Sequence, residues 1–299
     1  MVDIPYLERF VKVKEIQEGL SGDCKYYLES KEGQAYLLRI SELGLRDLKT
    51  QEFQILEQLK DYDLPIPLPI EMGLCHQEQA VYSLMTWMEG RVLEEVLPLM
   101  TPKDQYDLGL EAGRVLKRIH ETPGPKVVKD WLDRYKAVMD DRLEAFIKND
   151  TKFEGCDKIL SFLQAHQDLL MNRLQTRHHG DYHVGNMVVN DEGELSIIDW
   201  QIIDFDNYGD PWYDFNRMGL EFPAFKSGQI DGYFEGEIPE DFWILLAYYT
   251  SASAITSIVW AKFYSPDDLE DIIKLNRSIL DWYDQMTRIV PTWYQASEK

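Results

Sequence analysis

The chain has 299 residues, of which 44% are hydrophobic and 12% aromatic, a composition that predicts a folded globular protein rather than a disordered one. Its 53 acidic and 31 basic residues leave a formal net charge of -22, which would repel a nucleic-acid backbone, so no nucleic-acid partner is expected. Its 3 cysteines lie far apart and fit neither a disulfide framework nor a paired metal motif, which makes a reducing cytoplasm the default expectation.

The N-terminal part of the chain predicts β-strands. Residues 11–40 contain three short stretches rich in Val, Tyr, Leu and Ile, separated by glycine-containing turns, which is the pattern of antiparallel hairpins. The first turn contains Gly19, Ser21 and Gly22, and glycines at such a turn let backbone N–H groups approach a phosphate closely. Taken alone, the turn is more often an ordinary hairpin turn, because glycine is common in turns of every kind.

An amphipathic helix and two further strands follow. From about residue 48 to 60 apolar residues recur on one helical face, and Glu52 lies in the first turn. The proline-rich segment 64–69 ends this helix, and strands are predicted at about 70–73 and 80–86. After this last strand the chain changes to a mostly helical pattern, so we place the boundary between two domains there.

The remainder predicts helices around one dense polar stretch. The helices are expected at about residues 107–120, 131–148, 156–173, 211–220, 241–263 and 267–288. An uncharged run at 242–261 has nearly the length of a membrane span, but it contains five Ser and Thr residues. We therefore expect a buried core helix there and no membrane partner.

The polar stretch lies between His178 and Asp214 and has the sequence HHGDYHVGNMVVNDEGELSIIDWQIIDFDNYGDPWYD. Asp181 follows a His-Gly pair, Asn186 comes five positions later, and Asp199 ends the hairpin-like run GELSIID. This is the order of a kinase catalytic loop followed by a metal-binding aspartate. Amide and carboxylate oxygens suit Mg²⁺, so Asn186 and Asp199 are the candidate ligands, while Asp181 suits the acceptor hydroxyl.

Two other metal sites compete for the same residues. His178, His179 and His183 could form a zinc site, but no helix of the HExxH type surrounds them. Asp204 and Asp206 resemble a fragment of a calcium loop, yet they lack its twelve-residue pattern with a terminal glutamate. Phosphoryl transfer with Mg²⁺ explains more of the stretch than either.

Together these motifs give the chain a resemblance to a known superfamily. The HGDxHxGN string, the later IDW and the GDPxxD string resemble the aminoglycoside phosphotransferase and choline kinase-like superfamily, small-molecule kinases with a protein-kinase-like fold. The resemblance implies an α+β, two-lobe fold. An N-terminal lobe at 1–86, an antiparallel β-sheet with one helix, would bind the nucleotide. A larger, mostly helical C-terminal lobe at 87–299 would contain the catalytic loop and the acceptor site.

The resemblance also implies roles for single residues. Asp181 corresponds to the catalytic aspartate, and Asn186 and Asp199 correspond to the Mg²⁺ ligands. Thr86 and Met88 lie where main-chain groups meet the nucleotide base. His179 and His183 look like supports of the loop, and Asp210 and Asp214 look structural, holding the loop by hydrogen bonds.

The basic residue of the third strand departs from the family pattern. Arg39 occupies the position usually held by lysine, and Glu52 matches the helix glutamate that pairs with it. The planar fork of arginine is not equivalent to the point charge of lysine. We expect Arg39 to bind phosphate and to pair with Glu52, with Lys25 on the second strand as its substitute.

The expected function is transfer of the γ-phosphate of ATP or GTP to a hydroxyl of a small molecule, with Mg²⁺. An aminoglycoside-like or other cationic acceptor is the first expectation. The acidic composition is compatible with it, although such acidity more often only keeps a soluble protein dispersed. A kinase for choline, ethanolamine or another metabolite is the alternative within the enzyme class. A non-catalytic nucleotide-binding pseudokinase is the alternative of another class, and Arg39 is its only support in the sequence.

Overall fold

The computed structural model describes residues 7–17, 22–124, 129–148, 152–217 and 222–295. The chain forms two compact units, of which the first comprises Met1–Glu94 and Val184–Ile202 and the second comprises Glu95–His183 and Ile203–Lys299. This division differs from the predicted boundary after residue 86, because the first unit continues further and recruits a later segment. The segment joins it through strand pairing, which a boundary drawn along the sequence cannot anticipate.

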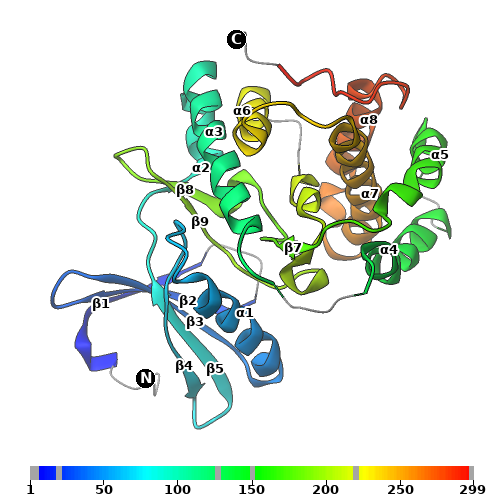
Figure 1. Cartoon of the computed structure of the whole chain (residues 1–299). Helices are drawn as coiled ribbons and strands as arrows, with labels where there is room; N and C mark the ends of the chain where they lie inside the picture. Colours follow the sequence, from blue (N-terminus) through cyan, green and yellow to red (C-terminus); the bar gives the residue numbers. More distant parts are fainter. Residues whose placement is uncertain (1–6, 18–21, 125–128, 149–151, 218–221, 296–299) are drawn as a thin grey trace. The chain divides into compact units, whose positions relative to one another are not determined.

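A five-stranded antiparallel sheet in the order β1-β2-β3-β5-β4 is the main part of the first unit (Figure 1). Its strands are β1 (Phe10–Ile16), β2 (Cys24–Ser30), β3 (Ala35–Glu42), β4 (Pro69–Cys75) and β5 (Ala80–Thr86). The strands predicted from the sequence are thereby confirmed. In the β2–β3 register Lys25 lies opposite Arg39, which brings the two basic candidates side by side.

Helix α1 (Arg46–Leu59) packs on this sheet (Figure 1). Ile55, Leu56 and Leu59 are buried, as the amphipathic pattern predicts. Lys49 and Glu52 are buried on the same helix, where charged side chains are seldom found without a partner. Their burial indicates that polar contacts under the helix hold them.

A small second sheet in the order β6-β8-β9 completes the first unit. Its strands are β6 (Arg91–Val92), β8 (Met187–Val189) and β9 (Leu195–Ile197), and α2 (Leu93–Val96) follows β6 across the division between the units. Gly90, with φ of 136°, lies so close to Val189 that a Cβ would come within 2.5 Å of its carbonyl oxygen. Only glycine fits this approach, which leads the chain into β6.

The second unit is mostly helical. Its elements are α3 (Pro102–His120), α4 (Trp131–Lys148), α5 (Cys156–His166), α6 (Pro223–Phe234), α7 (Glu240–Tyr264), α8 (Leu269–Trp282) and the paired short strands β7 (Thr176–Arg177) and β10 (Tyr208–Gly209). Two predictions need correction. The helix expected at 156–173 ends at His166, and the helix expected at 211–220 is a short 3₁₀ turn over Pro211–Phe215, beyond which 218–221 lie outside the described residues.

Helices α3 and α6 pack against each other at glycines (Figure 1). A Cβ on Gly109 or Gly113 of α3 would lie 2.1 Å from a carbonyl oxygen of α6, and the same holds for Gly228 and Gly232 against α3. Small residues four positions apart let the two backbones approach closely. Helix α6 was not expected from the sequence, because its apolar residues show little helical periodicity.

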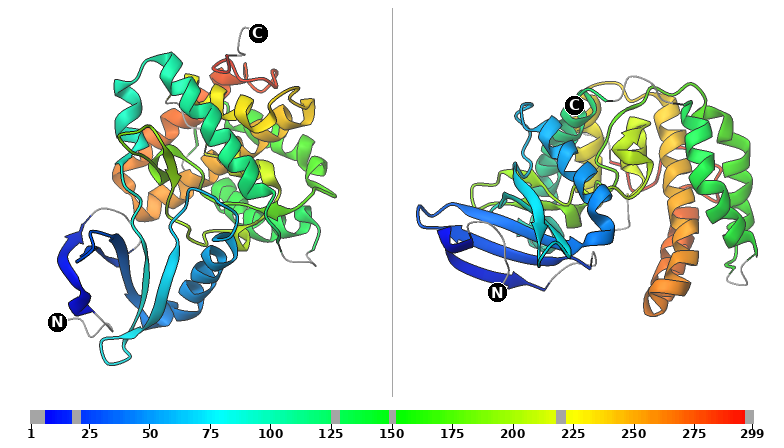
Figure 2. Two further views of the ribbon diagram at one scale, coloured as in Figure 1. Left: turned by 60° about the vertical axis from the view of Figure 1, so that its left-hand side comes forward. Right: turned by 90° about the horizontal axis from the view of Figure 1, so that it is seen from below.

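Helix α7 is the core helix of the second unit. Figure 2 shows it beside α4 and α5, and its buried side chains include Leu245, Leu246 and Ile255. Among the described residues it is the one helix long and apolar enough to cross a membrane, judged by length and composition alone. Of its most apolar stretch of 18 residues, 78% is buried inside the fold. That burial agrees with the core helix expected from the sequence.

Candidate functional site

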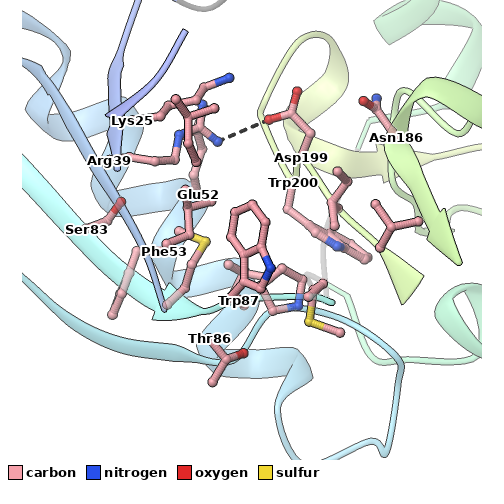
Figure 3. A pocket seen from close by; sticks show the side chains of 18 of the residues that line it. Lys25, Arg39, Glu52, Phe53, Ser83, Thr86, Trp87, Asn186, Asp199 and Trp200 are labelled. Atoms are coloured by element: carbon pink, nitrogen blue, oxygen red, sulfur yellow. Dashed lines mark hydrogen bonds and ion pairs between the residues drawn. The ribbon is translucent and has the colours of Figure 1, made fainter. Parts of the chain in front are cut away.

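A pocket of about 360 Å³ lies within the first unit (Figure 3). Seven residues predicted for the site line it: Lys25, Arg39, Glu52, Thr86, Met88, Asn186 and Asp199. Lys25 and Arg39 come from β2 and β3 on one side, and Asn186 and Asp199 come from the 184–202 segment on the other (Figure 3). The wall also contains apolar side chains, among them Leu37, Met85 and Trp87. Cations, oxygen ligands and an apolar wall thus share one cavity.

Arg39 is held by two carboxylates. Its Nε and Nη2 donate to Oδ2 of Asp23 at 3.1 and 2.8 Å, and its Nη1 donates to Oδ1 of Asp199 at 3.1 Å. The Asp23 side chain is only 1% exposed, whereas that of Asp199 is 34% exposed. Burial by itself would raise the pKa of Asp23, but bonds and charges from Ser41, Arg39 and Lys49 lower it below the usual range.

The predicted ion pair between Arg39 and Glu52 was wrong. Glu52 instead accepts from Lys49, three positions earlier on α1, with Nζ and Oε2 3.0 Å apart. Its Oε1 accepts the backbone N–H of Ile202 at 3.2 Å. The reason is local: Lys49 is the nearest cation on the same helix face, and Asp23 already holds the guanidinium of Arg39.

Lys25 is the second basic residue of the pocket. Burial lowers the pKa of its ammonium group, and the neighbouring Arg39 lowers it further, while Asp199 and Asp23 act in the opposite direction. The side chain lines the pocket on the same side as Arg39 (Figure 3). Two basic side chains therefore line the same side of the pocket.

Asn186 and Asp199 fit a magnesium ion by the chemistry of their oxygens. Oδ1 of Asp199 accepts from Arg39 and, at 2.5 Å, from Gln201, and within the described part of the chain Oδ2 has no hydrogen bond. No group of three His, Cys, Asp or Glu side chains gathers as a metal cage in those residues. Two ligands suffice for Mg²⁺, which keeps several waters and takes further oxygens from substrate phosphates.

The backbone at Asp199 is in the left-handed region, with φ of 62°. For a residue other than glycine this conformation costs about 1–3 kcal/mol, and such strain clusters at functional sites. The N–H of Gln201 donates to the carbonyl of Asp199 at 2.8 Å, and the Gln201 side chain bonds the carboxylate, which together stabilise the turn. The bonds from Arg39 and Gln201 hold the Asp199 carboxylate in place.

The strand end at Thr86 forms another wall of the pocket. The N–H of Thr86 donates to the carbonyl of Leu68, and its side chain accepts from the N–H of Leu68 at 2.8 Å. Trp87 donates its N–H to Ala35 on β3, and its ring meets Tyr27 edge to face. Met88 follows in the lining. These bonds hold the segment predicted to meet the base.

The glycine-containing turn is described only at its end. Gly19 and Ser21 lie outside the described residues. Gly22 has φ of 70°, which favours glycine, and no atom within 4 Å of a Cβ added there. Gly22 does not line the pocket, but its neighbour Asp23 binds Arg39.

Asp181 belongs to the second unit, in a loop held by Asp214. The N–H groups of His179 and Gly180 donate to the Asp214 carboxylate at 2.8 and 2.7 Å. His120 contacts the same carboxylate at 3.0 Å. Burial alone would raise the pKa of Asp214, but the bond with His120 and the nearby His178, 3.5 Å away, lower it far below the usual range. Asp214 therefore holds the loop by hydrogen bonds, as expected from the sequence.

The carboxylate of Asp181 faces two cationic or cation-forming groups. Nε of Arg217 lies 3.0 Å from its Oδ1, and Nε2 of His183 lies 3.4 Å from its Oδ2. Burial opposes ionisation of this carboxyl, but His183 and Arg217 outweigh it and lower the pKa of Asp181. Asp181 is thus ionised at neutral pH, which a proton acceptor requires.

Sequence reasoning missed three residues of these two sites, namely Asp23, Lys49 and Arg217. The spacing of three between Lys49 and Glu52 on a helix was a usable signal for their ion pair. Asp23 and Arg217 had no such signal, because each meets its partner only after the chain folds back on itself.

Comparisons with known proteins concern the family and the fold. The model of the phosphotransferase enzyme family matches residues 12–252. No curated protein matches the chain. Among solved structures, a thermostable mutant of aminoglycoside phosphotransferase APH(4)-Ia in ternary complex with ADP and hygromycin B is 17% identical, with a TM-score of 0.66 over 91% of this chain and 94% of that one.

Two further structures extend the likeness. The GDP and kanamycin complex of APH(2")-IIia is 16% identical, with a TM-score of 0.68 over 91% of this chain and 94% of that one. A choline/ethanolamine kinase family protein from Mesorhizobium loti is 13% identical, with a TM-score of 0.65 over 96% of this chain and 94% of that one. Likeness at these identities concerns the fold, and it confirms the predicted α+β, protein-kinase-like architecture.

Proposed function

Because the chain belongs to the phosphotransferase enzyme family, we propose that it is a kinase that transfers the γ-phosphoryl group of ATP or GTP to a hydroxyl of a small molecule. One observation carries this proposal: a single pocket combines the cations Lys25 and Arg39 with the oxygen ligands Asn186 and Asp199. Phosphoryl transfer depends mostly on positioning and on neutralising phosphate charge, and these residues supply both.

In this proposal each side of the pocket binds one part of the nucleotide. Lys25 and Arg39 bind phosphate oxygens. The phosphate contacts expected of Gly19, Ser21 and Gly22 stay a prediction, because Gly19 and Ser21 lie outside the described residues. Thr86 and Met88 meet the base through main-chain groups. A Mg²⁺ ion held by Asn186 and Asp199 would neutralise negative charge on the phosphates. Glu52 acts indirectly, by fixing Lys49 and the backbone at Ile202.

Asp181 is the proposed catalytic base. The acceptor hydroxyl gives its proton to the Asp181 carboxylate while its oxygen bonds to the γ-phosphorus. The bond from that phosphorus to the bridging oxygen breaks at the same time, and the nucleoside diphosphate leaves. Because the pKa of Asp181 lies below its ordinary value, the carboxylate is ionised at neutral pH and can accept a hydrogen bond from the acceptor hydroxyl.

We propose a cationic acceptor, aminoglycoside-like in the first instance. The net charge of -22 favours approach of an amine-bearing molecule, and two similar structures are complexes with hygromycin B and kanamycin. A choline- or ethanolamine-type acceptor is the alternative that the Mesorhizobium loti protein supports. A thermal-shift panel separates them, because stabilisation by choline but not by aminoglycosides would contradict the first choice.

A non-catalytic role as a pseudokinase has one observation in its favour. Arg39 is ion-paired with Asp199, which is the proposed metal ligand, so the pocket contains a contact that competes with Mg²⁺. Tight binding of Mg²⁺-nucleotide without transfer to any acceptor in a broad screen would favour this role. The presence of Asp181, Asn186 and Asp199 favours the kinase.

The test of the proposed function is transfer itself. Wild type, Asp181→Ala and the control Asp191→Ala, which alters an exposed aspartate in the β8–β9 turn, are incubated with Mg²⁺, ATP or GTP and a panel of aminoglycosides, choline and ethanolamine. Phosphorylated product is measured by mass spectrometry. We expect product from wild type and Asp191→Ala, and a loss of roughly 10²–10⁴-fold in Asp181→Ala. Equal turnover in all three proteins would refute the role of Asp181.

A further inference from the structure

Four charged residues that line the pocket and the buried Asp23 beside them form a ring of contacts. Asp23 binds Arg39 and, at 3.3 Å, Lys49. Arg39 continues to Asp199, while Lys49 continues to Glu52. The ring closes because Glu52 accepts the N–H of Ile202, three positions after Asp199 in the same segment. The turn before β2, strand β3, helix α1 and the segment after β9 are therefore tied to one another through side chains.

Asp23 is the most deeply buried carboxylate of this ring. Its side chain is 1% exposed, and it has three partners, since the hydroxyl of Ser41 donates to Oδ1 at 2.6 Å while Arg39 and Lys49 share Oδ2. A buried carboxylate with partners on both oxygens has little freedom to change them. Asp199 is more exposed, and only its Oδ1 is engaged in the described residues.

The guanidinium of Arg39 uses its two edges differently. The edge formed by Nε and Nη2 is directed at the buried Asp23, whereas Nη1 is directed at Asp199 in the wall of the pocket. Arginine presents five donors in a rigid fork, so one edge can stay bound while another nitrogen changes partner. Lysine, with one ammonium nitrogen, has no second edge to keep in place.

We propose that Asp23 is the positioning residue for phosphate binding in this protein, holding one edge of Arg39 while Nη1 exchanges Asp199 for a nucleotide phosphate. This inference rests on the proposed function, because it assumes that the pocket binds a nucleotide. It assigns to a buried aspartate beside the glycine-containing turn the part that the family resemblance gives to Glu52. Asp199, once released by Nη1, is available to a metal ion.

Asp23 and Asp199 are both carboxylates bound to Arg39, but replacing them is expected to change nucleotide binding in opposite directions. Replacing either by asparagine removes one negative charge next to the same guanidinium. If charge alone governed binding, both changes would tighten the binding of an anionic nucleotide. If Asp23 anchors Arg39, Asp23→Asn releases the Arg39 guanidinium and weakens nucleotide binding. Asp199→Asn instead removes the carboxylate that competes with the phosphate for Arg39, so nucleotide binding becomes tighter in the absence of metal.

The experiment is calorimetric titration of ATP and GTP, each with Mg²⁺ and with EDTA. The proteins are wild type, Asp23→Asn, Asp199→Asn, Glu52→Gln and the control Glu57→Gln. The control neutralises a glutamate of the same helix whose side chain is 39% exposed and pairs with Lys60. Thermal unfolding of each protein reports whether it is folded. Ser41→Ala, which removes one bond to Asp23, serves as a milder variant should Asp23→Asn not fold.

We expect Asp23→Asn to weaken nucleotide binding roughly 10-fold, as loss of a charge-assisted bond does, and Glu52→Gln to weaken it less. Ser41→Ala shifts affinity in the same direction by a smaller factor, and Glu57→Gln leaves it unchanged. In EDTA, Asp199→Asn binds more tightly than wild type.

Two results would overturn the inference, and they can be told apart. If wild type binds nucleotide and Asp23→Asn or Ser41→Ala binds as tightly or more tightly, Asp23 is not the anchor, while the proposed function stands. If wild type binds neither ATP nor GTP with Mg²⁺, the proposed function fails and this inference fails with it.

Discussion

Asp199 and Asp181 are the two carboxylates that the proposed reaction needs most, and their units hold them differently. Side chains hold Asp199: Arg39 and Gln201 donate to its carboxylate. Backbone bonds hold the loop of Asp181, because the N–H groups before it are fixed by the buried Asp214. The bonds that hold the Asp181 loop are part of the fold, whereas the carboxylate of Asp199 can change its partners.

Because of this difference, we expect changes at the Asp181 loop to affect folding and changes at Asp199 to affect binding. Breaking the anchor of the Asp181 loop leaves buried donors without an acceptor, which affects folding of the second unit. Changing the partners of Asp199 alters a half-buried contact in a pocket wall, which affects binding more than folding.

The largest effect is expected for Asp214→Asn. The amide replaces a carboxylate that accepts two backbone N–H groups and contacts His120, so the free energy of unfolding should fall by about 3 kcal/mol. Urea unfolding followed by circular dichroism measures it. Asp191→Asn, at an exposed turn, is the control and should change nothing. A stable Asp214→Asn protein would show that the loop does not depend on this anchor.

The next largest effect is expected at the packing contact between α3 and α6. Gly113→Ala places a Cβ 2.1 Å from the carbonyl oxygen of Gln229, so α3 and α6 must separate. We expect a loss of about 1–3 kcal/mol, the usual range for overpacking. Thermal unfolding compares it with Gly44→Ala, where a Cβ meets nothing within 4 Å. Equal melting temperatures for the two variants would contradict the close helix approach.

The smallest effect concerns the acidity of Asp181. Its pKa is lowered by His183 and Arg217, so Arg217→Gln should raise this pKa and move the acidic limb of kcat/KM to higher pH. We expect a small shift, because the Arg217 side chain is 46% exposed and solvent screens its charge. Arg114→Gln, an exposed arginine paired with Glu235, is the control. An unchanged profile would mean that Arg217 does not tune the base.

The sequence predicted most of the first unit because its signals are local. Strands with turn residues and an amphipathic helix follow from periodicity, and the motif around Asp181, Asn186 and Asp199 indicates the chemistry. Helix α6 was not predicted because glycine contacts with α3, rather than an apolar stripe, hold it in place. Such contacts depend on a partner distant in the sequence.

The ion pairs show where sequence reasoning ended. Both members of the expected pair, Arg39 and Glu52, line the pocket, yet each has another partner. Once β2, β3 and α1 have packed, the carboxylate of Asp23 lies 2.8 Å from Arg39, and the ammonium group of Lys49 lies 3.0 Å from Glu52. Pairing among several charges of both signs depends on distances of a few ångströms, which spacing along a chain does not give.

One measurement tests the kinase account most directly: the affinity for Mg²⁺-nucleotide and the rate of transfer, determined together for wild type, Asp181→Asn and Asp199→Ala. The account predicts that Asp181→Asn binds Mg²⁺-nucleotide as wild type does but transfers roughly 10²–10⁴-fold more slowly. It predicts that Asp199→Ala loses the dependence of binding on Mg²⁺. Transfer at the wild-type rate by Asp181→Asn, or Mg²⁺-dependent binding that survives in Asp199→Ala, would contradict it.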